Sequence, residues 1–144
     1  MVDKKFIGKK YPATVYEVGK EKIKEYAAAV GEVNPLYLDD EKAAAGPYGG
    51  IVAPPLFAVV YAKAPAGACL FDTELALNLP MLVHGEQEFE FGALVRPGDV
   101  ITTGGFIENI TDKKGKDFVT LKSESVNQKG ETVCSARWTF VIRG

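Results

Sequence analysis

The stretch that decides the fold reads IVAPPLFAVVYA and covers residues 51–62. Apolar side chains occupy every side of a helix drawn through it, so the pattern is not that of an amphipathic helix. Pro54 and Pro55 suit a helix start, where backbone N–H groups have no intrahelical partner to lose. A helix that is apolar all round must be buried, so we expect the rest of the chain to wrap around it.

Downstream of this stretch, from Leu82 onward, the hydrophobic period changes to two, which is typical of strands. One set of side chains alternates with a set of three glutamates: Gln87, Phe89 and Phe91 against Glu86, Glu88 and Glu90. Further strands are predicted over 100–107, 118–126 and 132–142, joined by turn-like segments such as residues 96–99, RPGD. We expect an antiparallel meander whose apolar face curls around the buried helix.

Upstream of the stretch, the pattern predicts a short strand near Tyr11 to Tyr16 and an amphipathic helix over Lys20 to Val30. Ile23, Tyr26, Ala27 and Val30 share its apolar face, and Gly31 stands where a left-handed residue would end it. A second, short helix is predicted over Asp39 to Ala45. Strand, helices and then strands make an α+β order, and we expect residues 1–144 to form one domain.

Composition excludes several classes of protein. The 144 residues include 17 Lys and Arg against 19 Asp and Glu, well mixed, so neither nucleic acid nor an anionic membrane has a charged surface to attract. No apolar run approaches a membrane span, and the N-terminus has no signal-peptide core, so we expect a cytoplasmic protein. Cys69 and Cys134 stand alone and are expected to be reduced. With one histidine and no cysteine at ligand spacing, no metal site is predicted.

Three segments together resemble a known family. They are residues 31–37, GEVNPLY; residues 83–91, VHGEQEFEF; and residues 96–99, RPGD. With the buried helix between the first two, the chain resembles MaoC-like hot-dog dehydratases over nearly its whole length. It is most similar to the N-terminal-type domain found in mycobacterial heterodimeric 3-hydroxyacyl-ACP dehydratases and in the first half of double hot-dog hydratases. The resemblance implies a hot-dog fold, in which an antiparallel sheet wraps around a central helix, and a dimer.

The resemblance also implies a reaction, with no cofactor. Such proteins dehydrate (R)-3-hydroxyacyl thioesters, or hydrate trans-2-enoyl thioesters, of CoA or acyl carrier protein. Active subunits carry an Asp-x-Asn-Pro-x-His loop, because a carboxylate and an imidazole must move a proton and a hydroxyl on one face of the Cα–Cβ bond. A backbone N–H at the start of the buried helix holds the thioester oxygen as enolate charge develops.

This sequence departs from that pattern at three places. Glu32 stands at the aspartate position and Tyr37 at the histidine position, while Asn34 and its proline are retained. A tyrosine, with an ordinary pKa near 10, is a poor base at neutral pH. Pro54 falls where active relatives place a glycine, and proline has no N–H to offer an oxyanion. The sequence therefore predicts an incomplete active site.

Two assignments remain open at this stage. The resemblance implies an acyl pocket lined by residues around the helix start: Tyr48, Gly50, Ile51, Val52, Pro54 and Phe57. Tyr48 and Phe57 would otherwise be ordinary core aromatics. His84 groups by strand parity with the three glutamates, away from the phenylalanines, and is either a general base or thioester contact or a hydrogen-bonded structural histidine.

Three functional hypotheses follow. The preferred one is a subunit of an (R)-specific dehydratase or hydratase that shapes the acyl pocket, while a second hot-dog chain supplies the intact Asp and His. The second is a homodimeric enoyl-CoA hydratase that uses Glu32 and His84. The third is a non-catalytic acyl-CoA binding domain, with a thioesterase as the related enzyme. All three take acyl-CoA or acyl-ACP as the partner molecule.

Overall fold

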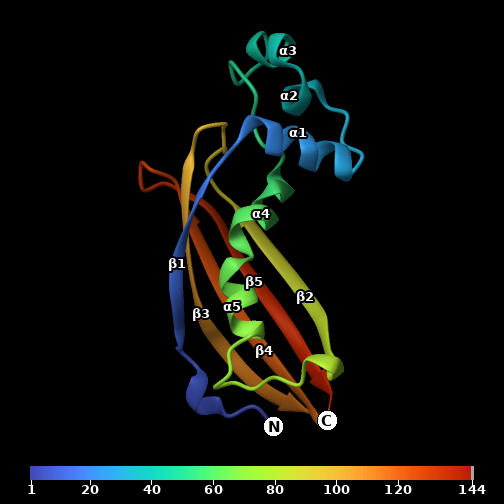
Figure 1. Ribbon diagram of the computed structural model, residues 1–144, viewed down its shortest axis with the longest axis vertical. Helices are drawn as coiled ribbons and strands as arrows, with labels where there is room; N and C mark the ends of the chain where they lie inside the picture. The colour runs from blue at the N-terminus through green and yellow to red at the C-terminus, as the bar shows by residue number, and fades with distance from the viewer. Residues whose placement is uncertain (144) are drawn as a thin grey trace.

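The computed structural model describes residues 1–143, in which five strands form one antiparallel sheet. The strands are β1 (Lys10–Glu17), β2 (Leu82–Phe91), β3 (Val100–Lys113), β4 (Lys116–Val126) and β5 (Thr132–Arg143). Their spatial order is β1-β3-β4-β5-β2, so β1 and β2 form the two edges (Figure 1). The predicted α+β order is confirmed.

The predicted meander is correct only for the last three strands. β3, β4 and β5 pair consecutively, but β2 pairs with β5 and not with β3. The reason is that β1 and β4 already occupy both edges of β3, so β2 must join the sheet at its far edge. Residues 92–99 then carry the chain back from β2 to β3, and Gly92 and Ala93 extend the pairing with β5 through hydrogen bonds to Val133 and Thr132.

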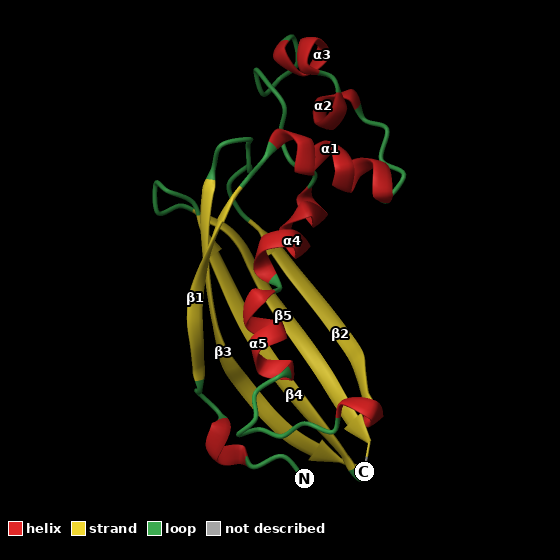
Figure 2. Cartoon of the chain, in the orientation of Figure 1, coloured by secondary structure: helices red, strands yellow, loops and turns green. Residues whose placement is uncertain are grey.

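The central helix lies along one face of the sheet (Figure 2), which we call the inner face. It consists of η2 (Pro55–Phe57), α4 (Ala58–Ala62) and α5 (Ala64–Leu70). It begins at the prolines, as predicted, but burial on all sides was too strong an expectation. Phe57 is fully buried, whereas Leu56 is 54% exposed and Val59 and Val60 are only partly buried. A single sheet covers one side of the helix and leaves the other side open.

Glycine allows the helix to approach the sheet closely. A Cβ built on Gly105 of β3 would lie 2.5 Å from the Cβ of Pro65 in α5. Beneath the helix, buried polar groups satisfy each other, with Trp138 Nε1 donating to Ser123 Oγ at 3.0 Å. Cys69 and Cys134 are free and buried, as expected of reduced thiols, and burial raises the pKa of each to about 11.

A helical cap extends past the end of the sheet (Figure 1). It comprises α1 (Lys20–Ala29), α2 (Pro35–Leu38) and α3 (Asp40–Ala44). Ile23 and Ala27 of α1 are buried as predicted, and Gly31 has the expected left-handed φ of 73°. Val30 is instead 58% exposed, because α1 stops one residue earlier and Val30 becomes its C-cap.

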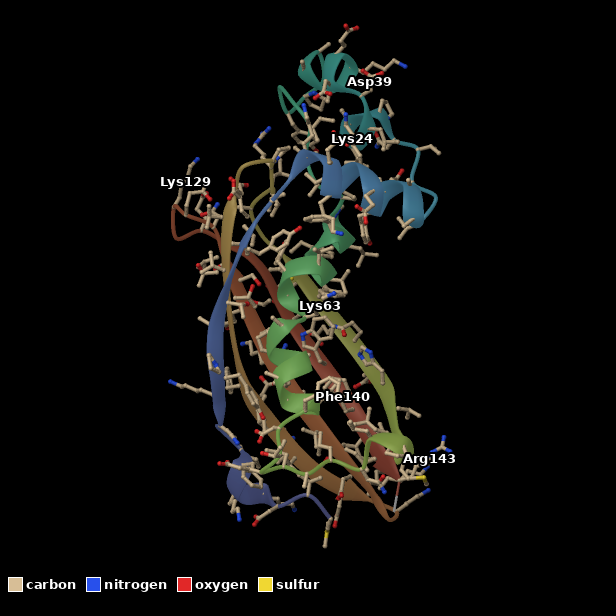
Figure 3. All side chains as sticks on the ribbon, in the orientation of Figure 1. Lys24, Asp39, Lys63, Lys129, Phe140 and Arg143 are labelled. Atoms are coloured by element: carbon tan, nitrogen blue, oxygen red, sulfur yellow. The ribbon has the colours of Figure 1, made fainter. Side chains whose placement is uncertain are left out.

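Two charged clusters join segments distant in sequence. Lys20 and Lys24 of α1, the latter labelled in Figure 3, each lie 3.1 Å from an oxygen of Asp40 in α3. At the opposite end of the molecule, Asp72 accepts a hydrogen bond from the Tyr11 hydroxyl at 2.8 Å and pairs with Lys9 at 2.6 Å. The second cluster fastens the start of β1 to the segment that follows α5.

Candidate active site

The loop that matches the family's catalytic motif is folded by its own side chains. Glu32 Oε1 accepts hydrogen bonds from the backbone N–H groups of Val33 at 2.9 Å and Asn34 at 3.0 Å. Asn34 in turn caps α2, its Oδ1 accepting from the N–H of Leu36 at 3.0 Å. This part of the chain is therefore a capped helical turn. One carboxylate oxygen of Glu32 is committed to holding that turn.

Tyr37 occupies the position of the family's histidine on α2 and is partly buried. Burial raises the pKa of its hydroxyl, and the nearby charge of Glu32 and the Tyr48 hydroxyl add to the increase. The phenol therefore stays protonated at neutral pH. It can donate a hydrogen bond to a substrate, but it is not a general base.

Tyr37 opens onto a small cavity of about 130 Å³, which we call the upper cavity. Its lining comes from the cap, the helix start, the end of β2 with the segment after it, and β5: Tyr37, Tyr48, Val52, Ala53, Pro55, Phe91, Gly92, Ala93, Leu94, Val95 and Val133. Ligand pockets usually enclose ~300–1,000 Å³, so the upper cavity is too small to hold a substrate by itself.

The predicted acyl-pocket residues divide into two groups. Tyr48 and Val52 line the upper cavity, whereas Gly50, Ile51, Pro54 and Phe57 do not. Phe57 has no exposed surface and packs its ring edge-on against Tyr26, at 5.7 Å between ring centroids. Of the two roles considered for Phe57, the structure places it as a core aromatic. Its neighbours were not evident from the sequence because they come from β1 and α1.

The start of the central helix offers little to an oxyanion. Pro54 is the N-cap of η2 and Pro55 is its first residue, so neither has an N–H. The N–H of Phe57 is already bonded to the Pro54 carbonyl at 2.9 Å. The prediction that Pro54 lies at the helix start is confirmed.

Sequence reasoning missed the role of Arg96. Its Nη1 donates to the carbonyl oxygen of Tyr48 at 2.7 Å, and its backbone N–H donates to Asp99 Oδ2 at 2.7 Å. Arg96 thereby holds the Tyr48 loop against the turn of residues 96–99, beside the upper cavity. The RPGD motif was the available signal, but only the fold shows what it contacts.

The predicted orientation of His84 was wrong. A β-bulge between His84 and Glu86 shifts the register, so His84 pairs with Phe140 of β5. Its ring lies 5.5 Å from that of Phe140 and 6.1 Å from that of Trp138, on the inner face of the sheet. The three glutamates face the other side. Gly85 permits the bulge, since a Cβ there would lie 2.6 Å from a methyl of Val141.

His84 borders a second hollow, the lower groove, which lies between the central helix and the sheet and has a volume of about 330 Å³. Its lining is mostly apolar: Lys63, Ala64, Ala66, Gly67, Leu70, His84, Trp138 and Phe140. Lys63 on the helix side and Phe140 on the sheet side are labelled in Figure 3. His84 Nε2 lies 3.1 Å from the carbonyl oxygen of Glu86.

The structure does not bring Glu32 and His84 together within one chain. Phe91 and Tyr37 line the upper cavity, while His84 lies near the other end of β2. At ~3.3 Å per residue, and with one residue lost to the bulge, the distance along β2 from Phe91 to His84 is roughly 20 Å. A pair formed from these two groups would need a second copy of the chain.

Residues 1–143 offer neither a cluster of metal ligands nor a membrane-spanning helix. No group of three or more His, Cys, Asp or Glu side chains could hold a metal ion there. None of the helices in that range is long and apolar enough to cross a membrane.

An antiparallel sheet wrapped on a central helix, with a helical cap above the helix start, defines a MaoC-like hot-dog protein. A chain of the C-terminally truncated HadBC (3R-hydroxyacyl-ACP dehydratase) complex from Mycobacterium tuberculosis has this architecture, with a TM-score of 0.80, 28% identity, and coverage of 94% of this chain and 96% of that chain. The MaoC-like dehydratase of Rhodospirillum rubrum matches with a TM-score of 0.71, 25% identity, and coverage of 95% and 92%.

The sequence comparisons give the family itself. The model described as FAS1-like, dehydratase domain region matches residues 5–136, so the chain belongs to that family. A UPF0336 protein of Saccharopolyspora erythraea is 40% identical, over 99% of this chain and 92% of its own length.

Proposed function

We propose that this chain is a subunit of an (R)-specific 3-hydroxyacyl-thioester dehydratase, which in reverse is an enoyl-thioester hydratase. In this proposal it shapes the acyl pocket, and a second hot-dog chain supplies the aspartate and histidine. The carrying observation is the state of the catalytic loop. Glu32 is tied to two backbone N–H groups, and Tyr37 is a protonated phenol where a base is needed.

The hollows of the molecule support a divided site. The upper cavity is smaller than an ordinary ligand pocket, while the lower groove has the volume and mostly apolar lining of one but, among the described residues that line it, has no carboxylate beside His84. Both lie beside β2, an edge strand on which a second chain could dock. A partner placed there would enlarge the upper cavity and bring its own acid and base to the thioester.

In the dehydration direction the partner's base removes a proton from Cα, and the hydroxyl leaves Cβ as water after it is protonated. This chain would exclude solvent and orient the acyl tail, and the Tyr37 hydroxyl could donate a hydrogen bond to the substrate. The alternative of a homodimer that uses Glu32 and His84 requires His84 to reach the upper cavity of the other copy.

The test is hydration of a short trans-2-enoyl-CoA by the purified chain alone, followed by loss of the conjugated-enoyl absorbance. We expect binding of acyl-CoA without turnover. Glu32→Gln and His84→Ala are assayed in parallel, with Glu124→Gln on the exposed outer face of β4 as the matched control. The proposal would be rejected, and the homodimeric alternative established, if the purified chain alone turns over the substrate, both variants abolish that turnover and the control retains it. Release of free CoA would instead indicate a thioesterase.

A further inference from the structure

The two edges of the sheet differ in how open they are to another strand. β1 carries Pro12 and an irregular register between Tyr11 and Thr14, both of which discourage pairing. β2 has no proline, and past its bulge it is regular from Glu86 to Phe91. β2 is therefore the edge that can accept a further strand.

Exposed apolar side chains lie at both ends of β2. Leu79, Met81 and Val83 are exposed where the strand begins, and Phe91 and Leu94 where it ends. Monomeric proteins seldom gather so many large exposed apolar groups along one unpaired strand. The strand and its flanks have the composition of a surface that is covered by another protein.

The outer face of this edge is acidic. Glu86, Glu88 and Glu90 lie opposite Thr139, Arg137 and Ser135 of β5 and share one face. Arg137 neutralises only one of them, its Nη1 lying 2.8 Å from Glu88 Oε1. Within residues 1–143, no ion pair or side-chain hydrogen bond engages the carboxylates of Glu86 and Glu90.

Antiparallel pairing of two identical copies through this edge would oppose these charges. Residues directly opposite each other must share a face, so the outer-face glutamates of one copy can only meet outer-face residues of the other. The two-fold axis that relates the copies can lie at any residue from Glu86 to Glu90. At each of these positions at least one glutamate of one copy lies directly opposite a glutamate of the other. Like charges directly opposite each other destabilise a strand pair.

We propose that the β2 edge selects a different chain, one whose own edge strand carries Lys or Arg on its outer face. This inference rests on the proposed function, which makes the partner a second hot-dog chain. It adds that the charge on the partner's edge strand distinguishes that partner from a copy of this chain. The glutamates supply specificity, while the apolar side chains at the two ends of β2 supply burial.

The test needs no knowledge of the natural partner, because a copy with a reversed edge can stand in for it. The double variant E86K/E90K leaves Glu88 and its bond to Arg137 intact. Wild type, variant and their equimolar mixture are compared by sedimentation equilibrium at low salt, with circular dichroism to confirm folding. With the two-fold axis at residue 86, 88 or 90 we expect the mixture to associate about tenfold more tightly than wild type, because opposed pairs become attractive. With the axis at 87 or 89 we expect the variant alone to do so, because one substituted position of each copy then lies opposite Glu88 of the other copy. The difference should vanish near 1 M salt, where the Debye length is ~3 Å.

The matched control is E17K/E25K, which makes the same change in net charge on β1 and α1, away from the edge. Mixing it with wild type should give no gain in association. The neutral variant E86Q/E90Q should associate with itself more tightly than wild type does. Two results would overturn the proposal. One is wild type that self-associates as tightly as both the mixture and the variant; the other is no association of either the mixture or the variant, in which case the glutamates only keep the edge unpaired. None of these association measurements involves substrate, so a failure of the charge-selection proposal can be distinguished from a failure of the proposed function.

Discussion

The upper cavity and the lower groove lie along the same inner face, at opposite ends of β2, and they are equipped differently. The upper cavity has the family's catalytic loop beside it, but Glu32 is bonded to backbone, and Pro54 and Pro55 at the helix start have no N–H. The lower groove is larger and apolar, and it holds the chain's histidine. The two hollows are thus roughly 20 Å apart along β2, so Glu32 and His84 of one chain do not lie in the same hollow.

The largest effect is expected at the floor of the lower groove. Trp138 is 5% exposed and donates to the buried Ser123, so Trp138→Ala should leave both a cavity and an unpaired hydroxyl. We expect a loss of about 4 kcal/mol in the free energy of unfolding, measured by urea denaturation. Trp138→Phe should cost about half as much and serves if the alanine variant does not fold. Val15→Ala, at an exposed site, should change stability by less than about 0.5 kcal/mol.

The upper cavity should be sensitive to a single methyl group at Gly92. A Cβ there would collide with the carbonyl oxygen of Thr132, and backbone cannot move aside as a flexible side chain can. Gly92→Ala should therefore cost about 3 kcal/mol. Gly104→Ala is the control, because no atom lies within 4 Å of its added Cβ. Equal losses for the two variants would show that helix or strand propensity, and not the close approach, sets the cost.

The cluster below the lower groove should show its effect through pH. Burial raises the pKa of Asp72, but hydrogen bonds from Lys9 and Tyr11 outweigh burial and lower the pKa to about 2. The contribution of Asp72 to the free energy of unfolding is therefore present above its unfolded pKa near 3.8 and is lost as pH falls toward 2. Asp72→Asn should cost about 2 kcal/mol at pH 7. Thermal unfolding at several pH values should show the gap to wild type closing below pH 4; a constant gap would contradict the assignment.

The smallest effect is expected at the loop beside the upper cavity. Glu32→Gln keeps an oxygen that can accept from Val33 and Asn34 but removes its charge, which should cost about 0.5–1 kcal/mol. The pKa of Tyr37 should fall yet remain above its ordinary value, because burial is the main cause of its increase. Tyrosine ring carbon shifts followed by NMR against pH measure this. If the pKa of Tyr37 returned to its ordinary value, the charge of Glu32 and not burial would be the main cause of its increase, which contradicts the description of Tyr37 as a buried phenol.

Prediction from sequence succeeded where a pattern is local. Spacing and the conformational limits of glycine and proline predicted the helix from Lys20 to Val30, which the structure ends one residue earlier, and its termination at Gly31. They also predicted the helix start at the prolines and the strands after Leu82. That the active site is incomplete stays a prediction, which depends on the residue types at Glu32, Tyr37 and Pro54.

What failed depended on partners remote in the chain. The parity of β2 predicted that His84 faces outward with the glutamates, but a bulge that Gly85 permits against Val141 turned it inward. Phe57 was equally suited to a pocket or a core until β1 and α1 supplied its neighbours. The position of β2 beside β5 followed from the occupancy of both edges of β3, which no local pattern records.

The sequence by itself therefore determined the class of elements, the position of the central helix and the family resemblance, because each arises from local periodicity or residue chemistry. Only the tertiary structure decided the strand order, the face on which His84 lies and the division of the inner face into two hollows. Those properties depend on which distant segments meet, and a one-residue change of register reverses the face of a side chain. The alternating glutamates were visible in the sequence, but only the tertiary structure showed that they lie on the outer face of an open edge strand.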